Sequence, residues 1–158
     1  MQIKKEFKDL IPPLTKEEFK QLENNCMSEG IREKILTWNG FIIDGHNRYE
    51  IATRWDLDFE TENKHFDNEE AVKEWMILNQ FGRRNLSNYQ RSVLALELEE
   101  VFSKKAKEKQ IEGGKNKVVQ ISEQAPMERK AITQISKVAS VSHDTIAKVK
   151  KIQEKAPE

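Results

Sequence analysis

The sequence predicts an α+β protein, with a small α/β domain in the N-terminal half and an all-helical segment at the C-terminal end. Two observations carry this prediction. Short β-type apolar runs alternate with helical patterns before residue 86, and two apolar stripes at helical spacing meet at a short turn after residue 128. A hydrophobic fraction of 37% over 158 residues suffices to bury a compact core in at least one domain.

Capping boxes predict where the helices begin. A Ser, Thr or Asp that is followed three residues later by Glu or Gln satisfies the first backbone N–H groups of a helix. This pattern occurs at 15–18, 67–70 and 87–90. The first helix is expected to run towards Gly30, and the last to be long.

A β-hairpin is predicted around Asn39-Gly40, a dipeptide that accepts the positive φ values of a two-residue type I′ turn. The apolar runs 34–38 and 41–43 on either side become its two strands.

The second strand is expected to enter a helix through a tight turn at Asp44-Gly45. In that helix Ile51, Ala52 and Trp55 share one face at helical spacing. A weaker strand is predicted over 57–62.

The polar stretch from Gly113 to Pro126 lacks helical periodicity, which is typical of a linker. We therefore expect four segments, namely an α/β domain (1–86), a long connecting helix (87–112), a linker (113–127) and a two-helix segment (128–158).

The charges are distributed unevenly along a chain whose formal net charge is zero. Residues 1–102 hold 14 basic and 20 acidic side chains, whereas 103–158 hold 13 and 7, so the two parts carry about −6 and +6. A basic C-terminal part favours a polyanionic partner such as nucleic acid. The alternative is a solvated Lys-rich helix and linker.

Membrane, redox and metal roles have little support in the sequence. No apolar run approaches the roughly 18 residues of a membrane span, and the N-terminus lacks the apolar core of a signal peptide, so we expect a cytoplasmic protein with no membrane contact. Cys26 is the single cysteine, expected on the first helix as an unreactive, packed or half-exposed thiol. The three histidines show no zinc-site spacing, and no metal site is predicted.

The C-terminal segment carries the pattern of a helix-turn-helix. One apolar stripe comprises Ile132, Ile135, Val138 and Ala139, and the other comprises Val141, Ile146, Val149 and Ile152. A small residue at 139 permits close helix approach, Val141 fills the turn, and Ser142 is the expected N-cap of the second helix. Ser140 stands where many such motifs have Gly.

The exposed start of that second helix is predicted to contact duplex DNA. The side chains expected to reach bases and phosphates are Ser142, His143, Asp144, Thr145 and Lys148, and those expected to favour the phosphate backbone are Lys150 and Lys151. The alternative is an ordinary helical hairpin whose polar face meets only water. His143 by itself is as well explained by solvent exposure.

Two patches in the N-terminal domain suit an anion. At Asp44-Gly45 the free N–H groups of a helix start lie near Arg48, which suits a phosphate, although Arg48 also has Asp44 or Glu50 as partners. Between two helices, Arg83 and Arg84 are paired beside an N-cap. Their alternative role is to balance acidic neighbours on the preceding helix.

Taken in order, these motifs resemble the ParB/sulfiredoxin superfamily, particularly the ParB-like proteins of phages and mobile elements. The resemblance spans nearly the whole chain and rests on residues 30–35, 44–49 and 79–86 and on the helix-turn-helix. It implies a ParB/sulfiredoxin-like α/β domain that binds a nucleotide, such as CTP or ATP with Mg²⁺. The residues implied are Gly45, His46, Asn47, Arg48, Asn79, Gln80, Arg83 and Arg84.

Both nucleotide boxes depart from the partition-protein pattern. Only Gly45 and Arg48 match the first box and only Arg83 the second, in which Asn79 replaces the acidic residue associated with magnesium. This favours a degenerate nucleotide pocket. The catalytic cysteine of sulfiredoxins is also missing from 44–48, which excludes reductase activity.

We therefore expect a DNA-binding ParB-like protein with no catalytic residues, acting in plasmid, phage or mobile-element partitioning or in transcriptional regulation. Because one small helix-turn-helix seldom gives useful specificity alone, a homodimer on double-stranded DNA is expected. The alternatives are a nucleotide triphosphatase switch of the CTPase type, a metal-dependent nuclease using Asp44, His46 and Asp56 or Asp58, and a module whose helix pair only mediates oligomerisation.

Overall fold

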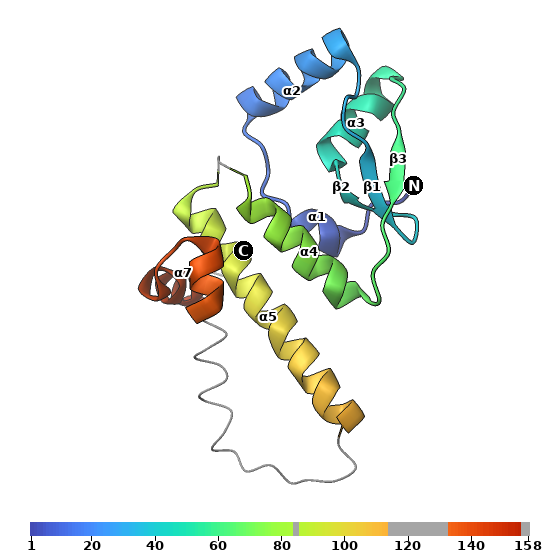
Figure 1. Ribbon diagram of the computed structural model, residues 1–158. Helices are drawn as coiled ribbons and strands as arrows, with labels where there is room; N and C mark the ends of the chain where they lie inside the picture. Colours follow the sequence, from blue (N-terminus) through green and yellow to red (C-terminus); the bar gives the residue numbers. More distant parts are fainter. Residues whose placement is uncertain (84–85, 114–132, 156–158) are drawn as a thin grey trace. The chain divides into compact units, whose positions relative to one another are not determined.

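The computed structural model describes residues 1–83, 86–113 and 133–155 (Figure 1). For residues 108–113 only the backbone is described. Arg84, Ile132 and nearly all of the predicted linker lie outside these ranges. The chain divides into two compact units, Met1–Val72 and Lys73–Glu158. The boundary between them falls within a helix that the sequence analysis placed wholly in the N-terminal domain.

The N-terminal unit is a small sheet with helices, as the α+β prediction requires. Its three strands follow the order β2-β1-β3, with β1 antiparallel to β2 and parallel to β3. The elements are α1 (Lys5–Asp9), α2 (Lys16–Glu29), β1 (Ile35–Trp38), β2 (Phe41–Asp44), α3 (His46–Trp55) and β3 (Thr61–Asn63).

The predicted hairpin is present. Asn39 and Gly40 both take positive φ values, 48° and 82°, as the type I′ turn demands. Beyond it, β3 pairs in parallel with β1, from Ile35 opposite Thr61. The weak strand predicted over 57–62 therefore begins and ends later than expected.

The core of this unit gathers around one aromatic residue of α1, a helix that the sequence patterns did not predict. The Phe7 ring is fully buried, and its centroid lies 6.3 Å from that of Trp38 and 6.5 Å from that of Phe41. Other buried apolar side chains are Leu10, Cys26, Ile35, Ile42, Ile43, Ile51, Ala52 and Val72. Burial raises the pKa of the Cys26 thiol, in keeping with an unreactive cysteine.

The second unit is all-helical in its described part. The helices are α4 (Glu69–Phe81), which begins in the first unit, α5 (Asn88–Gly113), a helix over residues 133–139, and α7 (His143–Lys155). Figure 1 shows α7 packed along the first half of α5. The buried apolar side chains are Met76, Ile77, Phe81, Leu94, Ala95, Leu98, Val101, Ile135, Ala139, Ile146 and Val149.

Local capping follows the sequence patterns with one shift. Reciprocal boxes close the starts of α2, at Thr15 and Glu18, and of α5, at Ser87 and Gln90. At α4 the Asn68 side chain accepts from the Ala71 N–H at 2.9 Å, so the cap is Asn68 rather than the residue before it.

The predicted apolar face of α3 is only partly buried. Ile51 and Ala52 lie in the core, whereas Trp55 is 48% exposed and its indole N–H donates to Glu23 at 2.8 Å. A tryptophan at a helix end keeps its polar edge where an acceptor can reach it.

Within the described ranges, no helix is both long and apolar enough to cross a bilayer.

Candidate functional site

The first predicted box lies where β2 ends and α3 begins. Gly45 occupies the N-cap of α3 with a φ of +88°, and its carbonyl accepts from the Tyr49 N–H at 2.8 Å. A residue without a side chain leaves the first N–H groups of the helix uncapped by its own atoms. The local geometry is thus a strand, a left-handed glycine and a helix N-terminus, as the sequence predicted.

Arg48 lies directly over this turn. Its Nη1 is 2.5 Å from Glu33 Oε2, and its Nη2 is 3.3 Å from Asp44 Oδ2. Of the two partners considered from sequence, Asp44 is the one in contact, because Glu50 pairs with Arg54 at 2.9 Å. The guanidinium is held at the helix start, but two carboxylates already balance its charge.

His46, the first residue of α3, is 5% exposed. Neither ring nitrogen has a hydrogen-bond partner among the described residues. Burial lowers the pKa of His46 to about 4, against a smaller opposing influence of Asp44. The imidazole is therefore neutral at pH 7, with one donor and one acceptor unused.

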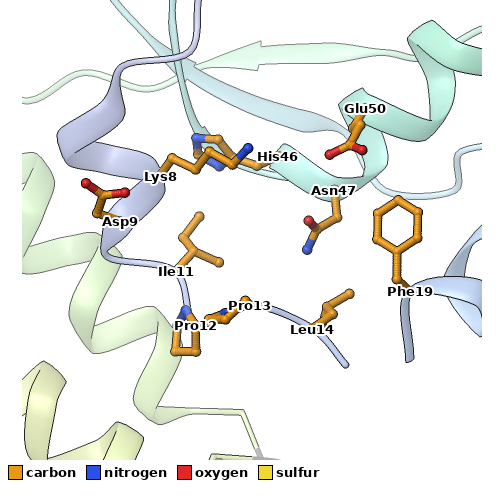
Figure 2. A pocket seen from close by; sticks show the side chains of 10 residues that line it. All are labelled: Lys8, Asp9, Ile11, Pro12, Pro13, Leu14, Phe19, His46, Asn47 and Glu50. Atoms are coloured by element: carbon orange, nitrogen blue, oxygen red, sulfur yellow. The ribbon is translucent and has the colours of Figure 1, made fainter. Parts of the chain in front are cut away.

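A cleft of about 540 Å³ opens beside His46 and is lined entirely by the first unit. Figure 2 shows that Lys8, Asn47 and Glu50 form its polar side, opposite an apolar side from the segment that joins α1 to α2. The ring of His46 also lines the cleft, with both nitrogens buried. The remaining lining residues are Asp9, Ile11, Pro12, Pro13, Leu14 and Phe19. An apolar wall facing a few convergent polar groups is the usual composition of a small-molecule site.

The second predicted box belongs to the other unit, at the end of α4. Asn79 is exposed, whereas Gln80 is only 1% exposed and its side-chain oxygen has no partner among the described residues. The Arg83 N–H donates to the Gln80 carbonyl at 2.9 Å, which folds the chain back after the helix. Because its side chain is buried, Gln80 is less accessible to a ligand than Asn79 is. Arg84, the remaining member, lies outside the described residues.

The C-terminal helix pair, residues 133–155, is joined by a tight turn. Ser140 takes a left-handed φ of +55°, its N–H donates to the Lys137 carbonyl and the Val141 N–H donates to the Ser136 carbonyl. These two bonds define a Schellman motif at the end of the first helix. Ser142 then caps α7 as predicted, because its Oγ accepts from the Thr145 N–H at 3.2 Å.

Six of the seven predicted DNA-contacting side chains are exposed, and the seventh is half-buried. The exposed ones are Ser142, His143, Asp144, Lys148, Lys150 and Lys151. Thr145 is half-buried, and its hydroxyl lies 2.8 Å from the Ser142 hydroxyl. Lys150 remains exposed, and its Nζ lies 3.9 Å from Glu99 Oε1 on α5.

The sequence analysis did not predict the apolar wall of the cleft or the contacts of Arg91. The cleft wall at Ile11, Pro13 and Phe19 had only the Pro12-Pro13 break as a signal. Arg91, whose guanidinium reaches across the second unit, resembles any polar residue of an amphipathic helix. Both depend on contacts between segments that are far apart in the chain.

No family model matches the chain, and no curated protein matches its sequence. Solved structures do match its fold. One is the C2221 form of a pNOB8-like ParB N-domain, with 17% identity and a TM-score of 0.71; the match covers 94% of this chain and 64% of that one. Another pNOB8-like ParB N-domain structure has 19% identity and a TM-score of 0.62, with 94% and 59% covered. This chain spans less than two thirds of either, and at these identities the likeness concerns architecture: the chain has the α+β fold of a ParB N-domain.

Proposed function

We propose that this chain is a DNA-binding protein of the ParB type, in which residues 133–155 act as a helix-turn-helix. The observation that carries the proposal is the division of α7 into two faces. Ile146 and Val149 are buried on one face, whereas Asp144, Lys148 and Lys151 project from the other. The fold of a ParB N-domain supports a partition-type role, in plasmids, phages or other mobile elements, or a role in transcriptional regulation.

The tight turn supports the DNA role because it fixes the start of α7 relative to the helix before it. In helix-turn-helix proteins, the N-terminal residues of the second helix meet base edges, and basic residues around it meet phosphates. Here Ser142, His143 and Asp144 occupy the first positions, and Lys148 and Lys151 follow on the outward face. A homodimer would place two such helices on one duplex.

Fluorescence anisotropy with a labelled generic duplex, titrated over a range of salt concentrations, tests the DNA role. Lys148→Ala/Lys151→Ala should weaken binding and reduce the slope of log K against log salt by about 2. The matched control is Lys16→Ala/Lys20→Ala, which removes two exposed lysines from α2 and should leave that slope unchanged. Binding that ignores salt would instead favour a helix pair used for oligomerisation.

A nucleotide, CTP or ATP with Mg²⁺, is the second ligand that we propose, with its phosphates at the start of α3. The support is local: a left-handed glycine, an uncapped helix start, Arg48 over the turn and the adjoining cleft beside His46. The ParB resemblance associates magnesium with an acidic residue where this chain has Asn79, and an amide is a weaker ligand for Mg²⁺ than a carboxylate, so we propose binding without efficient hydrolysis.

Isothermal titration calorimetry with Mg-CTP, Mg-ATP and Mg-GTP tests this second ligand. Arg48→Ala should abolish binding, whereas Arg32→Ala should preserve it, because among the described residues Arg32 pairs with Glu29 on the surface. Equal nucleotide affinity in both variants would show that the phosphates do not bind at the start of α3.

The metal-dependent nuclease has no comparable support. Among the described residues, no three His, Cys, Asp or Glu side chains lie close enough together to hold a metal ion. Asp44 is instead in contact with Arg48.

A further inference from the structure

β3 is the outermost strand of its sheet (Figure 1). Thr61, Glu62 and Asn63 are all exposed, and among the described residues no main-chain hydrogen bond is made on the side of β3 that faces away from β1. A strand edge of this kind presents unpaired N–H and C=O groups that another strand can satisfy. β3 is therefore a candidate site for pairing with a further strand.

The main-chain groups of β3 alternate between β1 and the open side. An N–H of β1 donates to the Glu60 carbonyl at 2.9 Å, and the Lys64 N–H donates to a carbonyl of β1 at 2.8 Å. Glu60, Glu62 and Lys64 therefore bond towards β1, because alternate residues of a strand face the same neighbour. The N–H and C=O groups of Thr61 and Asn63 point to the open side.

The charges beside this edge are self-complementary. Glu62 and Lys64 lie two residues apart, and Lys64 Nζ is 3.0 Å from Glu62 Oε1. Like charges at a strand edge keep other strands away, whereas opposite charges that face each other across a strand pair attract. We propose that two copies of this chain pair antiparallel through their β3 edges, around a twofold axis at Asn63. Each Glu62 then lies opposite Lys64 of the other copy.

The neighbouring registers bring like charges together. Main-chain hydrogen bonds form only in registers that pair outward-pointing residues with one another. Among these registers, an axis at Thr61 sets Glu60 against Glu62 of the second copy, and an axis at Glu62 sets that carboxylate against itself. The axis at Asn63 removes both repulsions, and it brings together two side-chain amides that can each donate and accept.

The proposed contact uses the same surface on both copies, as a twofold dimer requires. It supplies an interface for the homodimer of the proposed function, but it needs neither DNA nor a nucleotide. A pairing of so few residues gains only a few main-chain hydrogen bonds, so the association is weak in free solution. A covalent trap detects such an association, and binding of both copies to one duplex raises their effective concentration.

Disulfide trapping with diamide as the oxidant tests the position of the axis. In the proposed pair the two Asn63 Cα atoms are about 5.5 Å apart, within the reach of a disulfide, whereas the two Thr61 Cα atoms are about 13 Å apart along the strands. Asn63→Cys should therefore form the covalent dimer about tenfold faster than Thr61→Cys, which alters an exposed neighbour on the same edge. Wild type gives the background from Cys26, which is buried.

Charge reversal in the Asn63→Cys background tests the register. Glu62→Lys sets like charges opposite each other twice and should slow formation of the covalent dimer by about fivefold. The pair of changes Glu62→Lys and Lys64→Glu should restore the rate to within about twofold. The matched control is Glu17→Lys, which makes the same change of charge at an exposed position on α2 and should leave the rate within about twofold.

Equal rates for Asn63→Cys and Thr61→Cys would overturn the proposal, because they indicate random collision or another axis. A rate for Asn63→Cys no higher than the wild-type background would mean that the edge stays open or takes an occupant other than a second copy. Failure of the double charge reversal to restore the rate would also defeat the register. The duplex titration is a separate measurement, so the proposed function stands or falls independently of these results. If circular dichroism shows that Asn63→Cys is unfolded, a mixture of Glu62→Cys and Lys64→Cys takes its place and should crosslink faster than either variant alone.

Discussion

The guanidinium of Arg48 lies against the α-carbon of Gly45, so closely that a Cβ at position 45 would be 3.3 Å from Arg48 Nη2. Gly45 therefore serves two purposes. It takes the left-handed φ of +88° that turns β2 into α3, and it leaves room for the arginine over the helix start.

Alanine substitutions at Gly45 and at Gly40 distinguish the cost of the backbone conformation from the cost of moving Arg48. Both glycines have left-handed φ values, +88° and +82°, but nothing lies within 4 Å of a Cβ at Gly40. Gly40→Ala should lower the free energy of unfolding by about 1 kcal/mol through backbone strain alone. Gly45→Ala should cost about 2 kcal/mol, because the arginine must also move. Urea unfolding measures both, and equal losses would show that the close approach of Arg48 carries no cost.

Glu33 competes with any anion for Arg48. Its carboxylate is exposed and pairs with Arg48 Nη1, so a bound phosphate must displace it. Glu33→Gln should therefore tighten Mg-nucleotide binding by about threefold to tenfold. Glu29→Gln removes the same charge next to Arg32 and should have less than about a twofold effect. Calorimetry compares the two, and an unchanged affinity in Glu33→Gln would mean that the ligand does not approach Arg48.

Ser140 occupies a backbone position that glycine fills more easily. Its φ of +55° lies in the left-handed region, and its N–H makes one bond of the Schellman turn. Ser140→Gly should stabilise the protein by about 0.5–1 kcal/mol, whereas Ser140→Ala should give no gain. Thermal unfolding followed by circular dichroism checks both variants, and a loss in Ser140→Gly would show that the hydroxyl matters more than the backbone.

The buried His46 should make stability depend on pH. Burial lowers its folded-state pKa to about 4, below the ordinary value of 6.5, so the unfolded chain takes up the proton first as the pH falls. The stability that depends on neutral His46 is fully present above about pH 6.5. As the pH falls from there to 4, the free energy of unfolding decreases by at most about 3 kcal/mol.

Urea unfolding of wild type and His46→Gln at several pH values between 7.5 and 4 isolates this contribution. The difference in unfolding free energy between the two proteins should change over that interval and stay constant above it. Parallel curves would show that His46 has its ordinary pKa in the folded protein.

Local interactions were predictable because both partners lie within a few residues of each other. Each of these interactions lies within at most four consecutive residues. They are the boxes at Thr15 and Ser87, the left-handed turn at Asn39-Gly40 and the cap at Ser142. Their geometry depends on backbone preferences and on one side chain reaching its own helix. The α+β class follows from the sum of such elements.

The sequence by itself thus determined most of the elements and their order, although not helix α1. Only the tertiary structure decided that β3 pairs in parallel with β1, that Gln80 is buried, that His46 faces a cleft walled by Pro13 and that Arg91 reaches Ala139. These relationships join segments that chain entropy keeps apart until the core forms, so no short-range pattern encodes them. The free energy of packing, rather than local preference, selects such partners.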